Sequence, residues 1–169
     1  MSLEEYNEKR DFSATSEPKP SKAERRDKLV FVVQKHRASH LHYDFRLEWD
    51  GVLKSWAVPK GPSMNHGDKR LAVMTEDHPR DYAAFEGTIP EGQYGAGTVE
   101  IWDSGTWEPK EEFSDVDAAL GKGMLEFYLH GKKLKGEFVL VELKNSYTKN
   151  GWLLLKKRGR ICHGRPLRR

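Results

Sequence analysis

The chain has 169 residues, of which 33% are charged and 37% hydrophobic, and its formal net charge is +3 at pH 7. This length fits one domain with a hydrophobic core, and five Trp, seven Phe and six Tyr supply large core side chains. A single cysteine excludes an internal disulfide and favours a reducing compartment. The N-terminus is too polar for a signal peptide, and no apolar run of about 18 residues could span a bilayer, so we expect a cytoplasmic protein.

Positive charge is concentrated at the C-terminus. Residues 156–169 contain seven Lys or Arg and no acidic residue, so the preceding 155 residues carry 22 basic and 26 acidic side chains. A basic segment of this kind favours polyanions, because binding releases their counterions, but it is also typical of a solvated tail. Both interpretations stay open for the tail.

In chain order, residues 1–27 come first; they are polar and predict an irregular arm that leads into the domain. From residue 28 onward, short apolar or alternating segments are separated by turns rich in Gly and Asp, which predicts strands. The expected strands are 29–35, 40–49, 52–58, 69–75, 97–103, 123–129, 136–143 and 151–157.

Two segments interrupt this series of strands. One short helix is expected at 115–120, with Ser114 as its N-cap, Asp117 at the capping-box position and Gly121 at its end. Residues 87–97 form a glycine-rich loop that lacks the GxxxxGK(S/T) spacing, so we do not interpret it as a phosphate-binding P-loop.

Many short strands with frequent turns predict an all-β fold, namely a small closed or partly closed β-barrel of about eight strands with one or two short helices. The expected organisation is a polar N-terminal arm at 1–27, a barrel domain at 28–157 and a basic C-terminal tail at 158–169. We expect the arm to fold over the mouth of the barrel.

Residues 40–49 carry the most informative pattern, because polar and apolar side chains alternate strictly along them. Side chains in a strand alternate between its faces, so His42, Asp44 and Arg46 share one face and the apolar side chains pack into a core. An ordinary solvent-facing surface favours Lys, Thr and Ser. A row of imidazole, carboxylate and guanidinium groups therefore indicates a functional face.

Asp50-Gly51, directly after this strand, predicts a two-residue hairpin. The hairpin fixes which residues lie opposite one another in the two strands: Trp49–Val52, Arg46–Ser55, Phe45–Trp56 and Asp44–Ala57. On the polar face the second strand thus offers small side chains, which leave room for a ligand beside Asp44 and Arg46.

His42 and Asp44 form a compact pair of metal ligands, and His36, in the turn before the strand, is the nearest candidate for a third. Neutral imidazole and carboxylate suit Mn, Fe or Zn. Arg46 would add a planar set of donors that match phosphate. The alternative is a hydrogen-bonded network that stabilises the barrel mouth, and the short motif alone leaves both open.

A longer pattern carries a family resemblance. Residues 34–47, QKHRASHLHYDFRL, followed by 53–62, LKSWAVPKGP, closely resemble the 3'-phosphoesterase domain of bacterial DNA ligase D, which also occurs as free-standing bacterial and archaeal proteins. Further similar segments lie on both sides, at 9–12, 70–73, 76–79, 85–90, 92–97, 102–105 and 134–138. The resemblance covers most of residues 9–157.

The resemblance implies a β-barrel with a polar, crescent-shaped active site on its concave surface. It implies a hydrolase that uses Mn²⁺ or a similar divalent metal such as Zn²⁺ or Co²⁺. The implied enzyme removes a terminal ribonucleoside from the 3' end of a primer strand and then removes the 3'-phosphate, leaving a 3'-OH. Water or a neighbouring 2'-hydroxyl could be the nucleophile.

The implied setting is DNA repair by non-homologous end joining, in the cytoplasm and associated with the nucleoid. The implied partners are nucleic acid, as primer–template 3' ends of DNA or RNA-terminated DNA, and a separate ligase or polymerase. No membrane is involved.

The resemblance also implies residue roles. The implied metal ligands are His36, His42 and Asp44, and the implied phosphate contacts are Arg46, His78 and Tyr82. Other implied functional positions are Arg10, Asp11, Glu17, Gln34, Lys60 and Arg70. We expect His78 to act as general acid or oxyanion donor, because imidazole titrates near neutrality. The alternative for His78 is a loop histidine bonded to the backbone.

The remaining positions have weaker expectations. Asp11 and Glu17 could orient Arg46 or Arg70 by ion pairing, provided that the arm folds across the barrel. Gln34 could hydrogen-bond a ligand or a metal-binding histidine. Lys60 and Arg70 could contact phosphate or be ordinary surface charge.

Two other classes of protein compete with this interpretation. An iron- and 2-oxoglutarate-dependent oxygenase would also use His42 and Asp44, but with a distal histidine such as His130 or His163. A non-catalytic nucleic-acid-binding module would explain the basic tail and an exposed aromatic such as Tyr94, but not the polar strand face.

Overall fold

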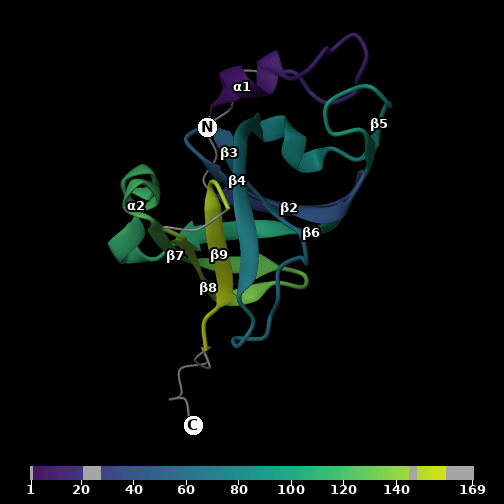
Figure 1. The fold of residues 1–169 in the computed structure, drawn as a ribbon. Coiled ribbons are helices and arrows are strands. Elements are labelled where there is room, and N and C mark those ends of the chain that lie inside the picture. Colours follow the sequence, from purple (N-terminus) through teal and green to yellow (C-terminus); the bar gives the residue numbers. More distant parts are fainter. Residues whose placement is uncertain (1, 21–27, 145–147, 159–169) are drawn as a thin grey trace.

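The computed structural model describes residues 2–20, 28–144 and 148–158 (Figure 1). The strands are β1 (Leu29–Arg37), β2 (Leu41–Trp49), β3 (Val52–Val58), β4 (Arg70–Pro79), β5 (Gly87–Ile89), β6 (Gly97–Pro109), β7 (Met124–Gly131), β8 (Lys135–Glu142) and β9 (Gly151–Lys156). The helices are α1 (Leu3–Glu8), α2 (Val116–Lys122) and the 3₁₀ helices η1 (Arg80–Ala84) and η2 (Glu111–Phe113). None of these helices has the length and apolar character that crossing a membrane requires.

Eight of the strands close into an antiparallel barrel. Their order is β1-β2-β3-β4-β9-β8-β7-β6, and β6 pairs with β1 to complete the ring. The short strand β5 adds to the end of β6 that β7 leaves free, where Gly87 lies opposite Val99. The predicted all-β barrel of about eight strands is confirmed.

The β2–β3 hairpin forms in the predicted register. Asp44 lies opposite Ala57 and Arg46 lies opposite Ser55. Asp50 and Gly51 both have positive φ, at 53° and 83°, which is the turn geometry that suits the right-handed twist of two paired strands. His42, Asp44 and Arg46 therefore share one face of β2, as the sequence predicts.

The interior of the barrel is apolar. Side chains from β1, β2, β3, β4 and from β6 to β9 meet there in one cluster, which includes Phe45, Trp56 and Phe127. Since side chains alternate along a strand, the polar face of β2 points away from this core. This polar face of β2 is therefore on the outside of the barrel wall.

A second, smaller apolar cluster covers that outer face. Tyr6 from α1 and Tyr82 from η1 pack there with Leu53, Ile89 and Val99. Figure 1 shows α1, η1 and β5 on one side of the barrel, with α2 next to β7 at another. The polar face of β2 is thus enclosed between the barrel wall and these covering segments.

The N-terminal arm is more ordered than the sequence suggests. Residues 3–8 form α1, capped by Ser2, and α1 packs against β4. Tyr6 is fully buried, and its hydroxyl donates to the carbonyl of Pro18. The expectation of an irregular segment missed this helix. At the other end of the chain, residues 159–169 of the expected basic tail lie outside the described residues.

The helix predicted at 115–120 forms as α2, but its ends differ from the prediction. Asp115, not Ser114, is the N-cap, because its carboxylate accepts the backbone N–H three residues later. Gly123, not Gly121, ends the helix in a left-handed conformation with φ of 87°, which glycine adopts at little cost.

Candidate active site

Three predicted ligands meet on the outer face of β1 and β2. His36 and His42 lie directly opposite each other in the β1–β2 pairing, and Asp44 follows two residues later on the same face. His36 Nδ1 is 3.5 Å from one Asp44 carboxylate oxygen, and His42 Nε2 is 3.4 Å from the other. One ligand atom from each residue lies within 4.8 Å of the others, so the triad fits a divalent metal.

Backbone carbonyls fix which ring nitrogen of each histidine is free. His36 Nε2 lies 2.7 Å from the carbonyl oxygen of Gly95, and His42 Nδ1 lies 3.0 Å from that of His40. A carbonyl only accepts, so these nitrogens carry the protons and the opposite nitrogens present lone pairs to Asp44. Two lone pairs and a carboxylate converge without a donor between them, which is the environment of a bound cation.

The charge state of Asp44 agrees with this. Burial by itself would raise the pKa of the Asp44 carboxyl, but the positive charge of the Arg46 guanidinium, together with the neighbouring imidazoles, outweighs it and holds the pKa well below its usual range. The carboxyl is therefore ionised at neutral pH. An ionised, buried carboxylate is a suitable ligand for a divalent cation.

Arg46 is held in place but keeps one donor free. Its Nε donates to Oε1 of Gln34 at 2.7 Å, its Nη2 lies 3.5 Å from Asp44, and the guanidinium lies over the Tyr82 ring at 4.8 Å. Its Nη1 is buried and has no hydrogen-bond partner among the described residues. A buried donor without an acceptor is costly, so this atom marks the place where an anionic ligand would bind.

Gln34 orients Arg46 rather than a histidine. Its amide nitrogen donates to the carbonyl oxygens of Tyr82 at 2.7 Å and Phe85 at 3.1 Å, which fixes its oxygen toward Arg46. The side chain is completely buried.

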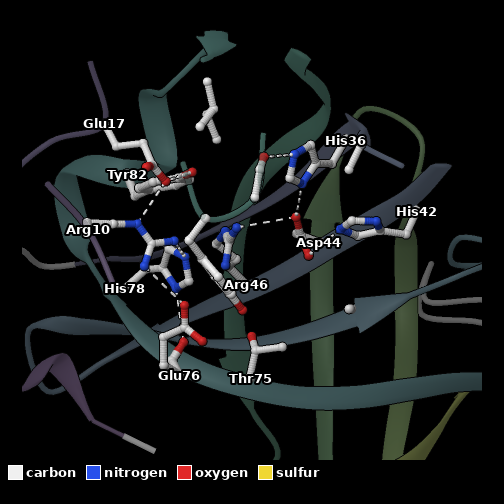
Figure 2. Close-up of a pocket in the computed structure, with 15 residues that line it drawn as sticks. Arg10, Glu17, His36, His42, Asp44, Arg46, Thr75, Glu76, His78 and Tyr82 are labelled. Carbon is white, nitrogen blue, oxygen red and sulfur yellow. Dashed lines mark hydrogen bonds and ion pairs between the residues drawn. The ribbon is translucent and has the colours of Figure 1, made fainter. Parts of the chain in front are cut away.

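His78 lies on β4, on the other side of Arg46 from the triad (Figure 2). Its Nδ1 donates to the carbonyl of Glu76 at 2.9 Å, and its Nε2 lies 3.3 Å from Arg10 Nη2, from which it accepts. Burial, together with the charges of Arg46 and Arg10, holds the pKa of His78 well below its usual value. The expectation that this imidazole titrates near neutrality therefore does not hold here, and His78 is neutral.

The arm completes the pocket. Arg10 Nε bonds to Glu17 at 2.9 Å, its Nη1 bonds to Glu76 at 3.2 Å, and the Tyr82 hydroxyl donates to Glu17 at 2.6 Å. Burial raises the pKa of the Tyr82 phenol, so Tyr82 stays protonated. Glu17 thus orients Arg10 and Tyr82, not the arginines that were expected as its partners.

Four predicted site residues are not part of the lining of this cavity of about 310 Å³. Gln34 is buried and contacts the pocket only through Arg46, and Asp11, Lys60 and Arg70 lie outside it. Asp11 is exposed and bonds to Ser13 in a local turn, and Lys60 is exposed. Arg70 lies 3.4 Å from Asp68.

Other lining residues were missing from the prediction. Glu76 shares the face of β4 with His78, two residues later, and binds Lys9 at 3.0 Å as well as Arg10. The alternation that identified the face of β2 would also have identified this pair. Tyr94, 48% exposed, lies at the rim of the pocket with Lys9 over its ring.

His130, one of the two distal histidines considered for an oxygenase, does not join this site. His130 is exposed and bonds to Glu108 at 2.9 Å, away from the pocket lining. His163 lies outside the described residues.

Comparison with known sequences agrees with the resemblance. A sequence model of the DNA ligase D 3'-phosphoesterase domain matches residues 34–142. Two relatives are the multifunctional non-homologous end joining protein LigD of Pseudomonas aeruginosa, 53% identical over 157 residues, and the multifunctional non-homologous end joining DNA repair protein LigD of Mycobacterium tuberculosis, 50% identical over 140 residues. A third is LigD of Mycolicibacterium smegmatis, 47% identical over 150 residues.

These matches cover most of this chain but a small part of each relative. They span 91%, 82% and 84% of this chain, in the same order, against 18%, 18% and 19% of the relatives. The chain therefore corresponds to about one fifth of the length of the curated relatives it matches.

Proposed function

The chain belongs to the DNA ligase D 3'-phosphoesterase family, and from that premise we propose that it is a metal-dependent hydrolase that repairs 3' ends of nucleic-acid strands. It removes a 3'-terminal ribonucleoside as a phosphodiesterase and the remaining 3'-phosphate as a phosphomonoesterase. The product is a 3'-OH that a separate ligase or polymerase can use in non-homologous end joining. The proposed metal is Mn²⁺, with Zn²⁺ and Co²⁺ as other ions that suit the ligands.

One observation supports this proposal above the others. The His36 and His42 rings converge with the Asp44 carboxylate beside a buried guanidinium nitrogen of Arg46 for which the described part of the chain offers no hydrogen-bond partner. A cation site next to a free anion donor suits a phosphate ester, because both sites would act on the same phosphate group.

His36, His42 and Asp44 would hold the metal, which as a Lewis acid would neutralise charge that develops on the phosphate. Arg46 Nη1 would donate to a non-bridging phosphate oxygen, and its orientation is already set by Gln34. The guanidinium needs no rearrangement when the substrate arrives, so its donor is preorganised for the transition state.

His78 would donate a proton to the leaving oxygen. It is neutral in the free site, with Nε2 as an acceptor, because burial and the charges of Arg46 and Arg10 lower its pKa. A phosphate dianion beside Arg46 would offset these charges, so His78 Nε2 could take up a proton with the substrate and give it to the leaving oxygen. Arg10 would move from Nε2 to the phosphate at the same time.

A gel assay tests the proposal. One 5'-labelled duplex ends in a 3'-ribonucleotide and a second ends in a 3'-phosphate, and each is incubated with Mn²⁺ and either wild type or His42→Ala. We expect wild type to convert both to 3'-OH ends, and we expect EDTA or His42→Ala to abolish both conversions. Metal-dependent binding of the duplex without any change at its end would support the non-catalytic nucleic-acid-binding module instead.

A further inference from the structure

A second hollow adjoins the pocket described above. It has a volume of about 440 Å³ and lies between the turn after β1 and the loop before β6. Its lining consists of Arg37, Ala38, Ser39, Glu91, Gly95, Ala96 and Gly97. Ala38 and Gly95 line both cavities, so the hollow is a continuation of the catalytic pocket past the metal ligand His36.

Glycines let the two walls of the hollow pack closely against each other. A Cβ on Gly97 would lie 2.2 Å from the carbonyl oxygen of Arg37, so the two walls touch backbone to backbone and glycine is required there. Gly95 and Gly97 both have positive φ, and their neighbour Ala96 is small. The lining of the hollow at these positions is therefore small and partly exposed, which leaves room for a ligand beside Arg37.

The opposite side of the catalytic pocket is closed. The Arg10 and Glu17 side chains, which close it there, are only 5% and 1% exposed. The His42 side chain, on the metal side, is 24% exposed. Figure 2 shows Arg10 and Glu17 on one side of Arg46, and His36 and His42 on the other. The side of the histidines is therefore open to a polymer whose end reaches Arg46, and the second hollow begins there.

Arg37 supplies a cation at this exit. Its side chain is 56% exposed, and its ion pair with Glu100, equally exposed, is long at 3.5 Å. Such a pair contributes about 1 kcal/mol or less, so the guanidinium can exchange it for a phosphate at little cost. Glu91 is the acidic side chain of the lining, and it is exposed at the surface.

We propose that this hollow binds the sugar–phosphate backbone of the substrate strand on the 5' side of the reacting phosphate, and that Arg37 contacts the first internucleotide phosphate. The proposal rests on the proposed function, since it assumes that the reacting phosphate lies beside Arg46. It assigns to Arg37 the recognition of a strand rather than of its terminal phosphate.

Binding without turnover tests the proposal first. A 5'-fluorescein-labelled single-stranded decamer with a 3'-phosphate is titrated in EDTA, and fluorescence anisotropy is followed at several salt concentrations. Arg37→Gln is expected to weaken binding about threefold to fivefold and to reduce the slope of log Kd against log salt by about 0.7. Lys122→Gln is the matched control, because it removes the same charge from the exposed end of α2. Equal affinity and equal salt slope in the two variants would overturn the proposal.

A substrate-length series separates this proposal from the proposed function. Phosphate release is measured from thymidine 3'-phosphate, which has no internucleotide phosphate, and from a trinucleotide with a 3'-phosphate. Arg37→Gln should raise KM for the trinucleotide about threefold to fivefold more than KM for the mononucleotide. Equal factors for both substrates would overturn the proposal, whereas a wild-type protein inactive on both, yet with the expected binding difference, would overturn the proposed function alone.

Discussion

Nε of Arg46 donates a 2.7 Å hydrogen bond to Oε1 of Gln34, and both side chains are buried. Gln34 is held in turn by two carbonyl oxygens, those of Tyr82 in η1 and Phe85 just after it. The backbone of this covering segment therefore sets the direction of the guanidinium through a single amide. Gln34 is a positioning residue, and Arg46 is the group that would touch the substrate.

Replacing Gln34 with leucine tests this relationship. Gln34→Leu removes the acceptor of Arg46 Nε and the Gln34 donor to the Phe85 carbonyl, while the Tyr82 carbonyl still accepts from the Phe85 backbone N–H. The free energy of unfolding should therefore fall by about 2 kcal/mol. kcat/KM for a 3'-phosphate oligonucleotide should fall roughly tenfold, because Arg46 loses its orientation. Urea unfolding and steady-state kinetics measure the two effects. A variant that loses stability but keeps the wild-type kcat/KM would contradict the positioning role.

Arg46→Lys keeps the charge but removes the planar guanidinium. The single ammonium nitrogen of lysine cannot donate to Gln34 and also place a second donor where Arg46 Nη1 now lies. We expect kcat/KM to fall roughly tenfold to a hundredfold, with metal affinity less affected. Activity within about twofold of wild type would show that positive charge alone is sufficient.

Gly95 should control metal affinity through its carbonyl. Its φ is +77°, a conformation that strains any other residue, and its carbonyl oxygen accepts from His36. Gly95→Ala should therefore shift this carbonyl and weaken Mn²⁺ binding, measured by calorimetry, roughly tenfold. Gly92→Ala is the control, because Gly92 has a φ of +88° in the same loop and nothing within 4 Å of its added Cβ. Equal affinity losses in the two variants would mean that loop strain, not the His36 contact, is responsible.

The buried His78 should make stability depend on pH. Its folded-state pKa lies well below 6.5 because of burial and the charges of Arg46 and Arg10, whereas the unfolded chain binds the proton near 6.5. Stability from this group is therefore complete above about pH 6.5 and is lost as the pH falls toward the folded-state value.

His78→Asn removes the titration while keeping a side-chain donor for the Glu76 carbonyl. Between about pH 7.5 and pH 5.5, the free energy of unfolding of wild type should fall about 1 kcal/mol more than that of the variant. Chemical denaturation at the two pH values measures this difference. Parallel changes in both proteins would contradict a neutral, buried imidazole.

The sequence was informative where the interactions are local. Strict alternation over 40–49 and the Asp50-Gly51 turn are short-range patterns, and both the hairpin register and the shared face of His42, Asp44 and Arg46 follow from strand geometry. The position of His36 opposite His42 also depends only on a short turn. These contacts join residues close in the chain, so the pattern determines them.

Contacts between segments that are distant in the chain could not be predicted from such short-range sequence patterns. Arg10 meets Glu76 and His78 across 66 and 68 residues, and the packing of Tyr6 against β4 decides this placement. Burial of His78 under this segment and the charges of Arg46 and Arg10 lower its pKa, and neither effect can be read from the sequence around His78. Lys60 and Arg70 have no local pattern that distinguishes a pocket residue from a surface charge.

A crystal structure of the protein with Mn²⁺, located by its anomalous scattering, tests the central claim most directly. We expect one peak within about 2.0–2.3 Å of His36 Nδ1, His42 Nε2 and an Asp44 carboxylate oxygen, with Arg46 Nη1 facing the open side of the ion. A peak elsewhere, or imidazoles whose other nitrogens face Asp44, would contradict the account.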